Sequence, residues 1–318
     1  MDLISLSYFS ELAKDLHMTR TANRLFISQQ TLSNHIQRLE EHFGVKLLHR
    51  KPNLSLTCAG EFVLSFAQVV NKEYVNLKDI LSDIEQQERG MISFGASSMR
   101  TNTCLPHILP EFSRQYPHVE LRLTDAISSK LEPMVLDGKL DFAIILSGDP
   151  NPKLVDHHLL NDQVYLCVAE HLLQQYYGDQ AEALKEKAIQ GANVTDFARL
   201  PFCMHSNRLG HKLLECFDEG GAEPNTYLTS EDTRITTSMC FQGIAACFAT
   251  QMRLINRQTD IPDDLNIFPV HHHGEPLIQR ISLIRRKDRY LSHYSKRFLD
   301  LLFQYFDDLD HIRLDRKI

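Results

Sequence analysis

LFISQQTLSNHIQRLEEHFGVKLLHR, residues 25–50, is the stretch that decides how the chain begins to fold. Apolar residues recur in it at intervals of three and four, the spacing of one buried helix face: Leu32, Ile36, Leu39 and Phe43. Ser28 precedes them in the position of a helix N-cap. The opposite face opens with uncharged amides and hydroxyls, although most soluble helices present charged side chains to water.

Two shorter helices are predicted ahead of this one. Residues 3–16 repeat apolar side chains at helical spacing, and a second helix is expected over residues 19–25 with Thr19 as its N-cap. Two or three residues then separate the second helix from the third. Two helices joined so closely are typical of a helix-turn-helix.

The neutral polar face is explained if the third helix enters the major groove of DNA. Gln and Asn can bond bidentately to adenine, and Ser or Thr can serve several bases, whereas long charged side chains bind phosphate without reading sequence. We therefore predict base-reading side chains at Gln29, Gln30, Ser33 and Asn34. A solvated polar face with no partner is the alternative.

A short hairpin, or wing, is predicted next. Residues 45–57 contain two strand-like segments around a turn at Pro52 and Asn53. Cationic side chains at its tip can reach phosphates, although an ordinary surface hairpin is the alternative. Contacts to the DNA backbone are predicted for five residues: Ser28, Thr31, Arg38, Arg50 and Lys51.

These residues closely resemble the winged helix-turn-helix of LysR-type transcriptional regulators. The matching positions are Ala22, Leu25, Ile27, Ser28, Gln29, Leu32, Ser33, Ile36, Leu39, Glu40, Phe43, Gly44, Leu47, Leu48, Arg50, Leu56, Thr57, Ala59 and Gly60. The sequence departs from the family pattern at Gln30, where proline is common, at Asn34, where arginine is common, and at Leu48, where phenylalanine is common. The first two lie on the reading face, so the preferred bases stay open.

A long linker helix is predicted over residues 61–89, capped by Thr57. Its apolar residues approach a heptad spacing, which favours a coiled-coil pair: Val63, Phe66, Val70, Tyr74, Leu77, Leu81 and Ile84. We expect a dimer through this helix, since two-fold proteins bind two DNA half-sites. Packing on its own chain is the alternative. The resemblance also implies linker-helix dimers, often assembled into tetramers.

From residue 90 onward, strand-like and helical segments alternate, which predicts a parallel sheet covered on both faces. Helices are expected over residues 105–116, with Pro106 in the first turn, and 292–306, and strands over 140–146, 163–170 and 278–286. The segment resembles the periplasmic-binding-protein-like effector domain of the same family. Its predicted parts are subdomain I, about residues 90–161 and 269–306, and subdomain II, about 162–268.

The predicted fold class is thus α + α/β: a winged helix-turn-helix (1–60), a linker helix (61–89) and a two-subdomain effector-binding domain (90–318). In such folds ligands bind between the units, at strand ends and helix N-termini, which favour anions. Candidate effector contacts are Ser97, Ser98, Met99, Arg100, Thr101, Ile127, Ser128, Ser129, Met204, His205 and Ser206. Arg100 could hold a carboxylate, although Ser and Thr at such places often just cap helices.

Composition supports this function and disfavours others. The formal charge is −7, yet residues 1–60 carry seven Lys and Arg against five Asp and Glu, which fits an N-terminal module with an anionic partner. Neither a secretory signal nor an apolar run of membrane-span length is found, so we expect a cytoplasmic protein. The expected partners are double-stranded DNA, a small effector, further copies of the chain and RNA polymerase, with no membrane and no cofactor.

Three other functions are the alternatives. The seven cysteines form no CxxC pair, and they are interpreted as reduced, buried thiols. A thiol-based redox sensor on the same scaffold, using Cys203 and Cys216, is the alternative, although Cys203 lies in an apolar run. We expect no enzyme and no metal site, because the three adjacent histidines at 271–273 should alternate faces on a strand and cannot all bind one ion. A non-specific structural DNA binder is disfavoured by the amide-rich face.

Overall fold

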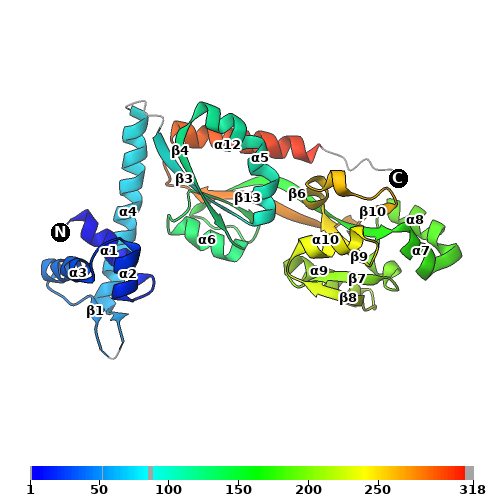
Figure 1. Cartoon of the computed structure of the whole chain (residues 1–318), viewed down its shortest axis with the longest axis horizontal. Helices are drawn as coiled ribbons and strands as arrows, with labels where there is room; N and C mark the ends of the chain where they lie inside the picture. The colour runs from blue at the N-terminus through cyan, green and yellow to red at the C-terminus, as the bar shows by residue number, and fades with distance from the viewer. Residues whose placement is uncertain (1, 52, 85–88, 312–318) are drawn as a thin grey trace.

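The computed structural model describes residues 2–51, 53–84 and 89–311, and its parts follow one another along a long axis (Figure 1). A small helical module packs on the first half of one long helix, α4, and an α/β body with two lobes lies beyond it. We call these lobes subdomain I and subdomain II. The predicted fold class is therefore confirmed: winged helix-turn-helix, linker helix and two-part α/β domain.

The N-terminal module is a three-helix unit with a two-stranded wing. Its elements are α1 (Leu3–Ala13), α2 (Met18–Arg24), α3 (Gln29–Phe43), β1 (Leu48–His49) and β2 (Ser55–Leu56). The predicted apolar faces form its core, in which Leu6, Phe9, Leu32, Ile36 and Leu39 are completely buried. The prediction of Thr19 as N-cap was wrong, because the imidazole Nδ1 of His17 accepts the Arg20 amide (3.3 Å) and starts α2 earlier.

A buried carboxylate attaches the wing to α3. Glu40 accepts the backbone amides of Leu47 (3.0 Å) and Leu48 (3.4 Å) and the ammonium group of Lys46 (2.9 Å). Burial alone would raise the pKa of Glu40, but these donors outweigh burial and lower it. The next helix starts so close to the wing that a Cβ at Gly60 would lie 2.1 Å from the Leu47 carbonyl oxygen, so a residue without a side chain is needed there.

The linker helix α4 spans Cys58–Ile84, and Thr57 caps it by accepting the Gly60 amide at 2.9 Å. The prediction that it continues to residue 89 was wrong, because Arg89 is already the first residue of strand β3. Residues 85–88 lie outside the described part of the chain. Neither α4 nor any other described helix combines the length and hydrophobicity that a membrane span requires.

The apolar stripe of α4 differs from the predicted seam. Val63 and Val70 are partly buried against the core of the N-terminal module instead of facing outward, and the side chain of Ile84 lies outside the described part of the structure. Seven large apolar side chains on the described part of α4 remain exposed: Phe62, Phe66, Val69, Tyr74, Val75, Leu77 and Leu81. We call these seven residues the α4 stripe.

Subdomain I is a sheet with helices on both faces. Its strands are β3 (Arg89–Ala96), β4 (His118–Asp125), β5 (Phe142–Leu146) and β13 (Ile278–Arg286), with the first part of β6 (Leu154–Ala169). Its helices are α5 (Ser98–Gln115), α6 (Ser128–Leu136) and α12 (His293–Asp310). Helices α5 and α12 pack together on one face, and α6 covers the other face (Figure 1).

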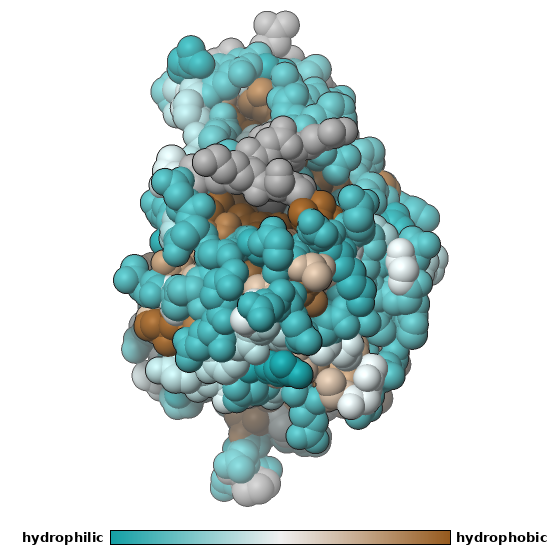
Figure 2. Space-filling view, turned by 90° about the vertical axis from the view of Figure 1, so that its right-hand side faces the viewer, coloured by the Kyte–Doolittle hydropathy of each residue, from teal (hydrophilic) through white to brown (hydrophobic). Residues whose placement is uncertain are grey.

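Subdomain II repeats this layered arrangement around the second part of β6. Its strands are β7 (Pro201–His205), β8 (Asn225–Ser230), β9 (Ala246–Thr250) and β10 (Leu265–Pro269). Its helices are α7 (Glu170–Tyr177), α8 (Ala181–Ile189), α9 (Arg208–Glu219), α10 (Thr233–Phe241) and α11 (Gln251–Ile255), with short 3₁₀ turns at Gly178–Gln180, Val194–Phe197 and Gln258–Asp260. A small hairpin, β11 (His271–His272) with β12 (Glu275–Pro276), precedes β13. Figure 2, which views this end of the molecule, shows a mostly hydrophilic surface.

Strands β6 and β13 connect the two subdomains. The sheet order is β4-β3-β5-β13-β6-β9-β7-β8, and β10 also pairs with β6. Along β6, residues 154–163 pair with β13, and residues 164–169 then pair with β9 and β10. The change of partner occurs beside Asp162, so this residue lies where the two subdomains meet.

Two elements of the body are longer than predicted. Helix α5 begins at Ser98, so Pro106 lies inside it, and the prediction of a helix start near Pro106 was wrong. A proline lacks one amide donor, but the rest of this helix is held by its packing on α12. Strand β6 begins at Leu154 instead of residue 163, because its polar first half is held by pairing with β13.

A buried polar cluster attaches α4 to subdomain I. Arg289, between β13 and α12, donates Nε to Asp141 Oδ1 (2.8 Å), Nη1 to Asn76 Oδ1 (2.8 Å) and Nη2 to Asp79 Oδ2 (2.6 Å). Tyr294 donates its hydroxyl to the other oxygen of Asp79 (2.7 Å). Burial alone would lower the pKa of Arg289, but the two carboxylates outweigh burial and raise it. We call these five residues the clasp.

Candidate functional site

The first turns of α3 present neutral polar side chains to solvent, as the sequence predicts. Ser28 caps the helix by accepting the Thr31 amide at 3.0 Å, and Gln29, Gln30 and Asn34 are exposed. The Gln30 amide donates to Asn34 Oδ1 (3.1 Å), so these two side chains already hold each other in one orientation. Ser33 is half-buried and less available than the three amides.

Cationic side chains surround this face. Arg38, Arg50 and Lys51 are exposed and make no ion pair within the described residues. Arg24 differs, since its guanidinium bonds Asp15 at 2.8 Å and holds the pKa of that carboxyl at about 2. Cations without a carboxylate partner are those that a polyanion can engage at no cost in broken ion pairs.

Three predicted effector residues at helix starts in subdomain I already have hydrogen-bond partners within the described structure. The Ser98 amide donates to Asp125 (2.8 Å), the Thr101 hydroxyl donates to the Ser98 carbonyl (3.1 Å), and the Ser128 hydroxyl accepts the Leu146 amide (2.9 Å). The remaining members, placed around the same two helix starts, are Ser97 and Met99, both half-buried, and Ile127 and Ser129, both exposed. The capping alternative is not confirmed for either helix, because the N-cap residues, Ser97 and Ile127, make no side-chain cap hydrogen bond in the described structure.

Arg100 is the predicted effector residue with the most unusual surroundings. It is 5% exposed, and its Nη1 reaches the Ser97 hydroxyl at 3.3 Å, but its Nε has no partner among the described residues. Burial lowers the pKa of Arg100 to about 10, against the attraction of Asp162. A buried guanidinium with an unused donor is poised to bind an additional acceptor.

Asp162 is the counterpart of Arg100 on β6, and the sequence analysis missed it. Its Oδ1 accepts the Met252 amide (2.8 Å) at the start of α11, while its Oδ2 has no partner among the described residues. Burial raises the pKa of Asp162 to about 6. Met252 follows a strand of subdomain II but packs in the core of subdomain I, so this hydrogen bond lies between the subdomains.

Two further buried polar residues flank Met252. Thr250 ends β9, where its hydroxyl lies close to Asp162 and lowers the pKa of that carboxyl without forming a hydrogen bond of normal geometry, and Arg253, which is 6% exposed, has an unpartnered Nη2 within the described structure. The Nε of Arg253 donates weakly to the Thr237 hydroxyl at 3.5 Å. We call Arg100, Asp162 and Thr250 the unsatisfied cluster, since Arg100 and Thr250 both act on the Asp162 carboxyl. The sequence signal that could have identified Asp162 and Arg253 was a charged residue inside a strand or shortly after one.

The predicted effector residues of subdomain II are less accessible. Met204 belongs to the core of subdomain II, and His205 is buried with its Nε2 bonded to the Phe248 carbonyl at 2.7 Å. Burial lowers the pKa of His205 despite that bond. Ser206 is exposed, and its amide donates to the Ser230 carbonyl (3.1 Å).

The cysteines have the character of inert interior thiols. Six of the seven are buried, and Cys58 alone is exposed. Burial raises the pKa of Cys203 to about 11 and also raises that of Cys216, and these two residues belong to different core clusters. Reactive thiols need exposure and a lowered pKa, so neither residue has the setting of a redox sensor.

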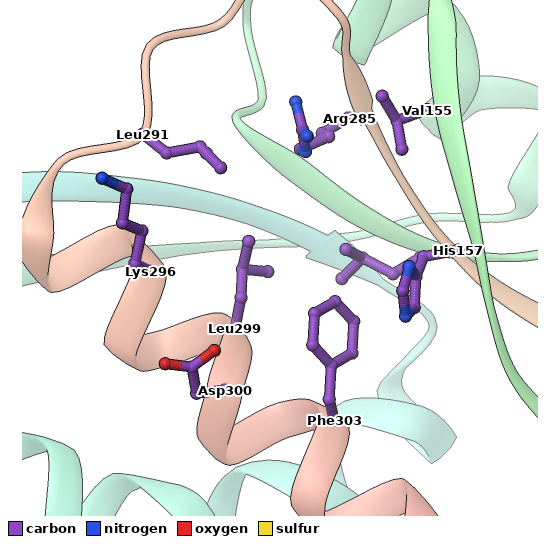
Figure 3. Close-up of a pocket in the computed structure, with 9 residues that line it drawn as sticks. Val155, His157, Arg285, Leu291, Lys296, Leu299, Asp300 and Phe303 are labelled. Carbon is purple, nitrogen blue, oxygen red and sulfur yellow. The ribbon is translucent and has the colours of Figure 1, made fainter.

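A cavity of about 260 Å³ lies elsewhere, between α12 and strands β6 and β13 of subdomain I. Figure 3 shows Leu299 and Phe303 projecting from α12 into this space, with His157 and Arg285 approaching from the strands. None of the predicted effector residues lines it. The cavity and the unsatisfied cluster are therefore separate candidate ligand sites.

Known proteins match this architecture over its whole length. The bacterial regulatory helix-turn-helix protein model of the lysR family matches residues 3–61, and the LysR substrate binding domain model matches residues 85–307. An uncharacterized HTH-type transcriptional regulator, YcgK of Bacillus subtilis strain 168, is 26% identical, with 97% of each sequence covered.

Solved structures show the same fold. A full-length OxyR variant from Pseudomonas aeruginosa aligns with a TM-score of 0.65 and 19% identity, covering 96% of this chain and 94% of that chain. Full-length CbnR complexed with its target DNA aligns with a TM-score of 0.57 and 19% identity, covering 96% and 100%. Since one family model matches more than half of the chain and the other matches its N-terminal module, the protein belongs to the LysR family of transcriptional regulators.

Proposed function

We propose that this regulator binds specific double-stranded DNA sites as a homo-oligomer and is switched by a small anionic effector held between subdomains I and II. The observation that supports specific reading most directly is the exposed amide face of Gln29, Gln30 and Asn34 at the start of α3. Amides can distinguish bases, while the neighbouring cations, Arg38 and Arg50, supply affinity for any duplex.

The α4 stripe supports dimerisation through the linker helix. Exposed apolar side chains gathered on one helix usually mark an interaction surface. A two-fold pair of α4 helices would present two α3 helices to two DNA half-sites. Assembly into a tetramer and contact with RNA polymerase in the cytoplasm are further parts of this proposal, and they rest on the family alone.

The unsatisfied cluster supports an anionic effector. Arg100 holds a buried nitrogen donor without a partner in the described structure, and a carboxylate is an acceptor that suits guanidinium groups. An effector can shift the protein only by binding one arrangement of the subdomains better than another, and a difference of about 1–3 kcal/mol is enough.

Two substitutions in the N-terminal module test the DNA proposal. Gln29→Ala should relax the preference for one base by about 1–3 kcal/mol while leaving affinity for random DNA unchanged. Arg50→Ala should weaken binding to all duplexes and lower its salt dependence. Footprinting upstream of the protein's own gene, followed by binding competition with random DNA, measures both effects. An identical, uniform loss in the two variants would contradict these roles.

The effector proposal is tested with a panel of small carboxylates and their neutral amides as matched controls. The midpoint temperature of thermal unfolding of the full chain should rise when at least one carboxylate is added. None of the amides should raise it. Arg100→Met should abolish that rise, whereas Leu299→Trp, which fills the cavity of Figure 3, should leave it intact. If Leu299→Trp lost the carboxylate-induced rise in unfolding temperature and Arg100→Met retained it, the ligand would lie in the cavity and the proposal would be overturned.

The redox alternative makes a different prediction. A thiol sensor would change its footprint when treated with peroxide, whereas buried thiols with raised pKa values should not react. We therefore expect the same footprint with and without peroxide. We also infer that the protein catalyses no reaction, and turnover by the purified chain would contradict this inference.

A further inference from the structure

Three potential metal ligands meet at the surface of subdomain II. Glu219 is the last residue of α9, while His272 and His273 belong to the β11–β12 hairpin. The Oε2 of Glu219 lies 2.9 Å from His272 Nε2 and 3.0 Å from His273 Nε2, and the three ligand atoms all lie within 4.8 Å of one another. This group shares no residue with the unsatisfied cluster or the DNA-reading face.

The hairpin turn explains why two consecutive histidines point the same way. His273 and Gly274 form the two-residue turn, and both have positive φ, 51° and 83°. Two central residues with positive φ are the mark of a type I′ hairpin turn. This left-handed conformation interrupts the strand alternation, so the rings of His272 and His273 lie with centroids 4.0 Å apart.

The expected alternation of faces therefore fails for His272 and His273, although the three histidines still do not meet at one point. His271 keeps the alternation and lies against Gly191, where a Cβ would be 2.5 Å from the His271 ring nitrogen. His272 and His273 instead converge on Glu219. The sequence alone could not show this, because a positive φ at His273 is not visible in a run of three identical residues.

The two N···O distances suit a first-row transition-metal ion, whereas the imidazole nitrogens, which lie within 4.8 Å of the other ligand atoms, can come closer by rotation of the exposed His273 side chain. At bond lengths of about 2.1 Å, neighbouring ligands of a tetrahedral or octahedral ion lie roughly 3.0–3.4 Å apart. The two observed N···O distances therefore need little change when an ion replaces the hydrogen bonds. Imidazole favours Zn²⁺, Cu²⁺, Co²⁺ and Ni²⁺, whereas Mg²⁺ and Ca²⁺ prefer oxygen ligands.

We propose that Glu219, His272 and His273 form a binding site for a divalent transition-metal ion, of which Zn²⁺ is the representative case. The side chains of His273 and Glu219 are 76% and 47% exposed, so an ion can enter from solvent without opening the fold. Three protein ligands leave at least one coordination position for water. A bound ion would join the end of α9 to the hairpin that leads into β13, a strand that connects the two subdomains.

The experiment uses the untagged full-length protein, since an added polyhistidine tag would bind the same ions. Calorimetric titration at neutral pH measures the stoichiometry and affinity for Zn²⁺, with Mg²⁺ as a control ion, and the Co²⁺ visible spectrum reports ligand geometry. The variants are His273→Asn and Glu219→Gln. Asparagine tolerates the left-handed turn conformation, so His273→Asn removes the ligand while keeping the hairpin. The matched control is His211→Ala, which removes an exposed histidine from the same helix as Glu219.

We expect the parent protein and His211→Ala to bind one more equivalent of Zn²⁺ than either site variant, or to bind Zn²⁺ at least tenfold more tightly. Titration with Mg²⁺ should release no binding heat in any of these proteins. The difference from the control matters because the chain has 16 histidines that could bind ions weakly. Unchanged far-ultraviolet circular dichroism and DNA binding without metal would confirm that the variants are folded. The proposal is overturned if His273→Asn and Glu219→Gln bind Zn²⁺ as the parent does, or if His211→Ala loses as much as they do.

Discussion

Arg289 and Arg100 are buried to nearly the same degree, 7% and 5% exposed, yet their surroundings are opposite. In the clasp, every nitrogen of the Arg289 side chain donates to an oxygen, and two of the acceptors are carboxylates. In the unsatisfied cluster, Arg100 keeps a donor without a described partner, and its one nearby carboxylate, Asp162, also has an unused oxygen. The pKa of Arg289 is raised, and that of Arg100 is lowered to about 10.

The difference separates a structural cation from a functional one. A buried polar group without a partner costs about 1–3 kcal/mol, so folding alone does not explain why Arg100 stands where it does. The clasp has no such deficit, and it joins two parts of the chain that are distant in sequence. Burial by itself therefore does not identify a site, and we infer from its unused hydrogen-bonding capacity that Arg100 is a candidate ligand-binding residue.

The largest effect is expected from breaking the clasp. Arg289→Met removes the cation and leaves Asp79 and Asp141 buried without their partner, which should lower the free energy of unfolding by about 3–5 kcal/mol. Urea unfolding of the full-length protein measures this loss. A change in the free energy of unfolding below about 1 kcal/mol would mean that Arg289 stabilises the fold no more than Arg100 is expected to.

The second effect concerns pH and Asp162. Its pKa is about 6 in the folded protein against an ordinary value of 3.8, so folding favours the protonated form. The free energy of unfolding therefore contains a contribution of about 3 kcal/mol from protonated Asp162. This contribution is fully present below the unfolded pKa and is lost as the pH rises from about 4 to about 6. Asp162→Asn should remove that loss, which is measured as the difference between the parent and variant urea midpoints at the two pH values. Parallel pH profiles for parent and variant would contradict the assignment.

A smaller change in stability is expected from Arg100→Met without any effector. The substitution deletes an unsatisfied donor and keeps an apolar stem, so the free energy of unfolding should stay within about 1 kcal/mol of the parent value. The same urea experiment measures it beside Arg289→Met, which serves as the contrasting control. A loss as large as that of Arg289→Met would show that Arg100 is structural.

The smallest effect is expected at the solvent-exposed edge of the same α4 interface. Lys72 pairs with Asp288, whose side chain is 54% exposed. Water and salt screen such a pair, so Lys72→Ala should lower the free energy of unfolding by about 1 kcal/mol or less, and added salt should reduce the loss further. A loss that matches Arg289→Met would indicate that position in the interface matters more than burial.

Local patterns in the sequence predicted much of the fold. Strand β13 over Ile278–Arg286 has the predicted bounds, because its sequence combines a clear period with clear end signals. The first half of β6 was missed because its polar residues follow its pairing with a distant strand. The start of α5 was misplaced because Pro106 is usually a first-turn residue and here lies inside the helix.

The site residues were likewise predicted where a local pattern marks them and missed where distant parts of the chain come together. The exposed amides of α3 were predicted, since one helix carries them all and their spacing shows their common face. Asp162 and Thr250 were missed because strand pairing brings them to Arg100 from separate parts of the chain. Met204 was proposed from its place after a strand, but the register of β7 turns it into the core.

The clasp has a mechanical consequence for signalling. It ties α4 to Asp141, Arg289 and Tyr294, all of which belong to subdomain I, so buried hydrogen bonds join the linker helix to that subdomain. Subdomain II is joined to subdomain I through β6, β13 and the short α11 contact. Under the proposed function, a ligand that draws the two lobes together would therefore move subdomain II relative to subdomain I and α4.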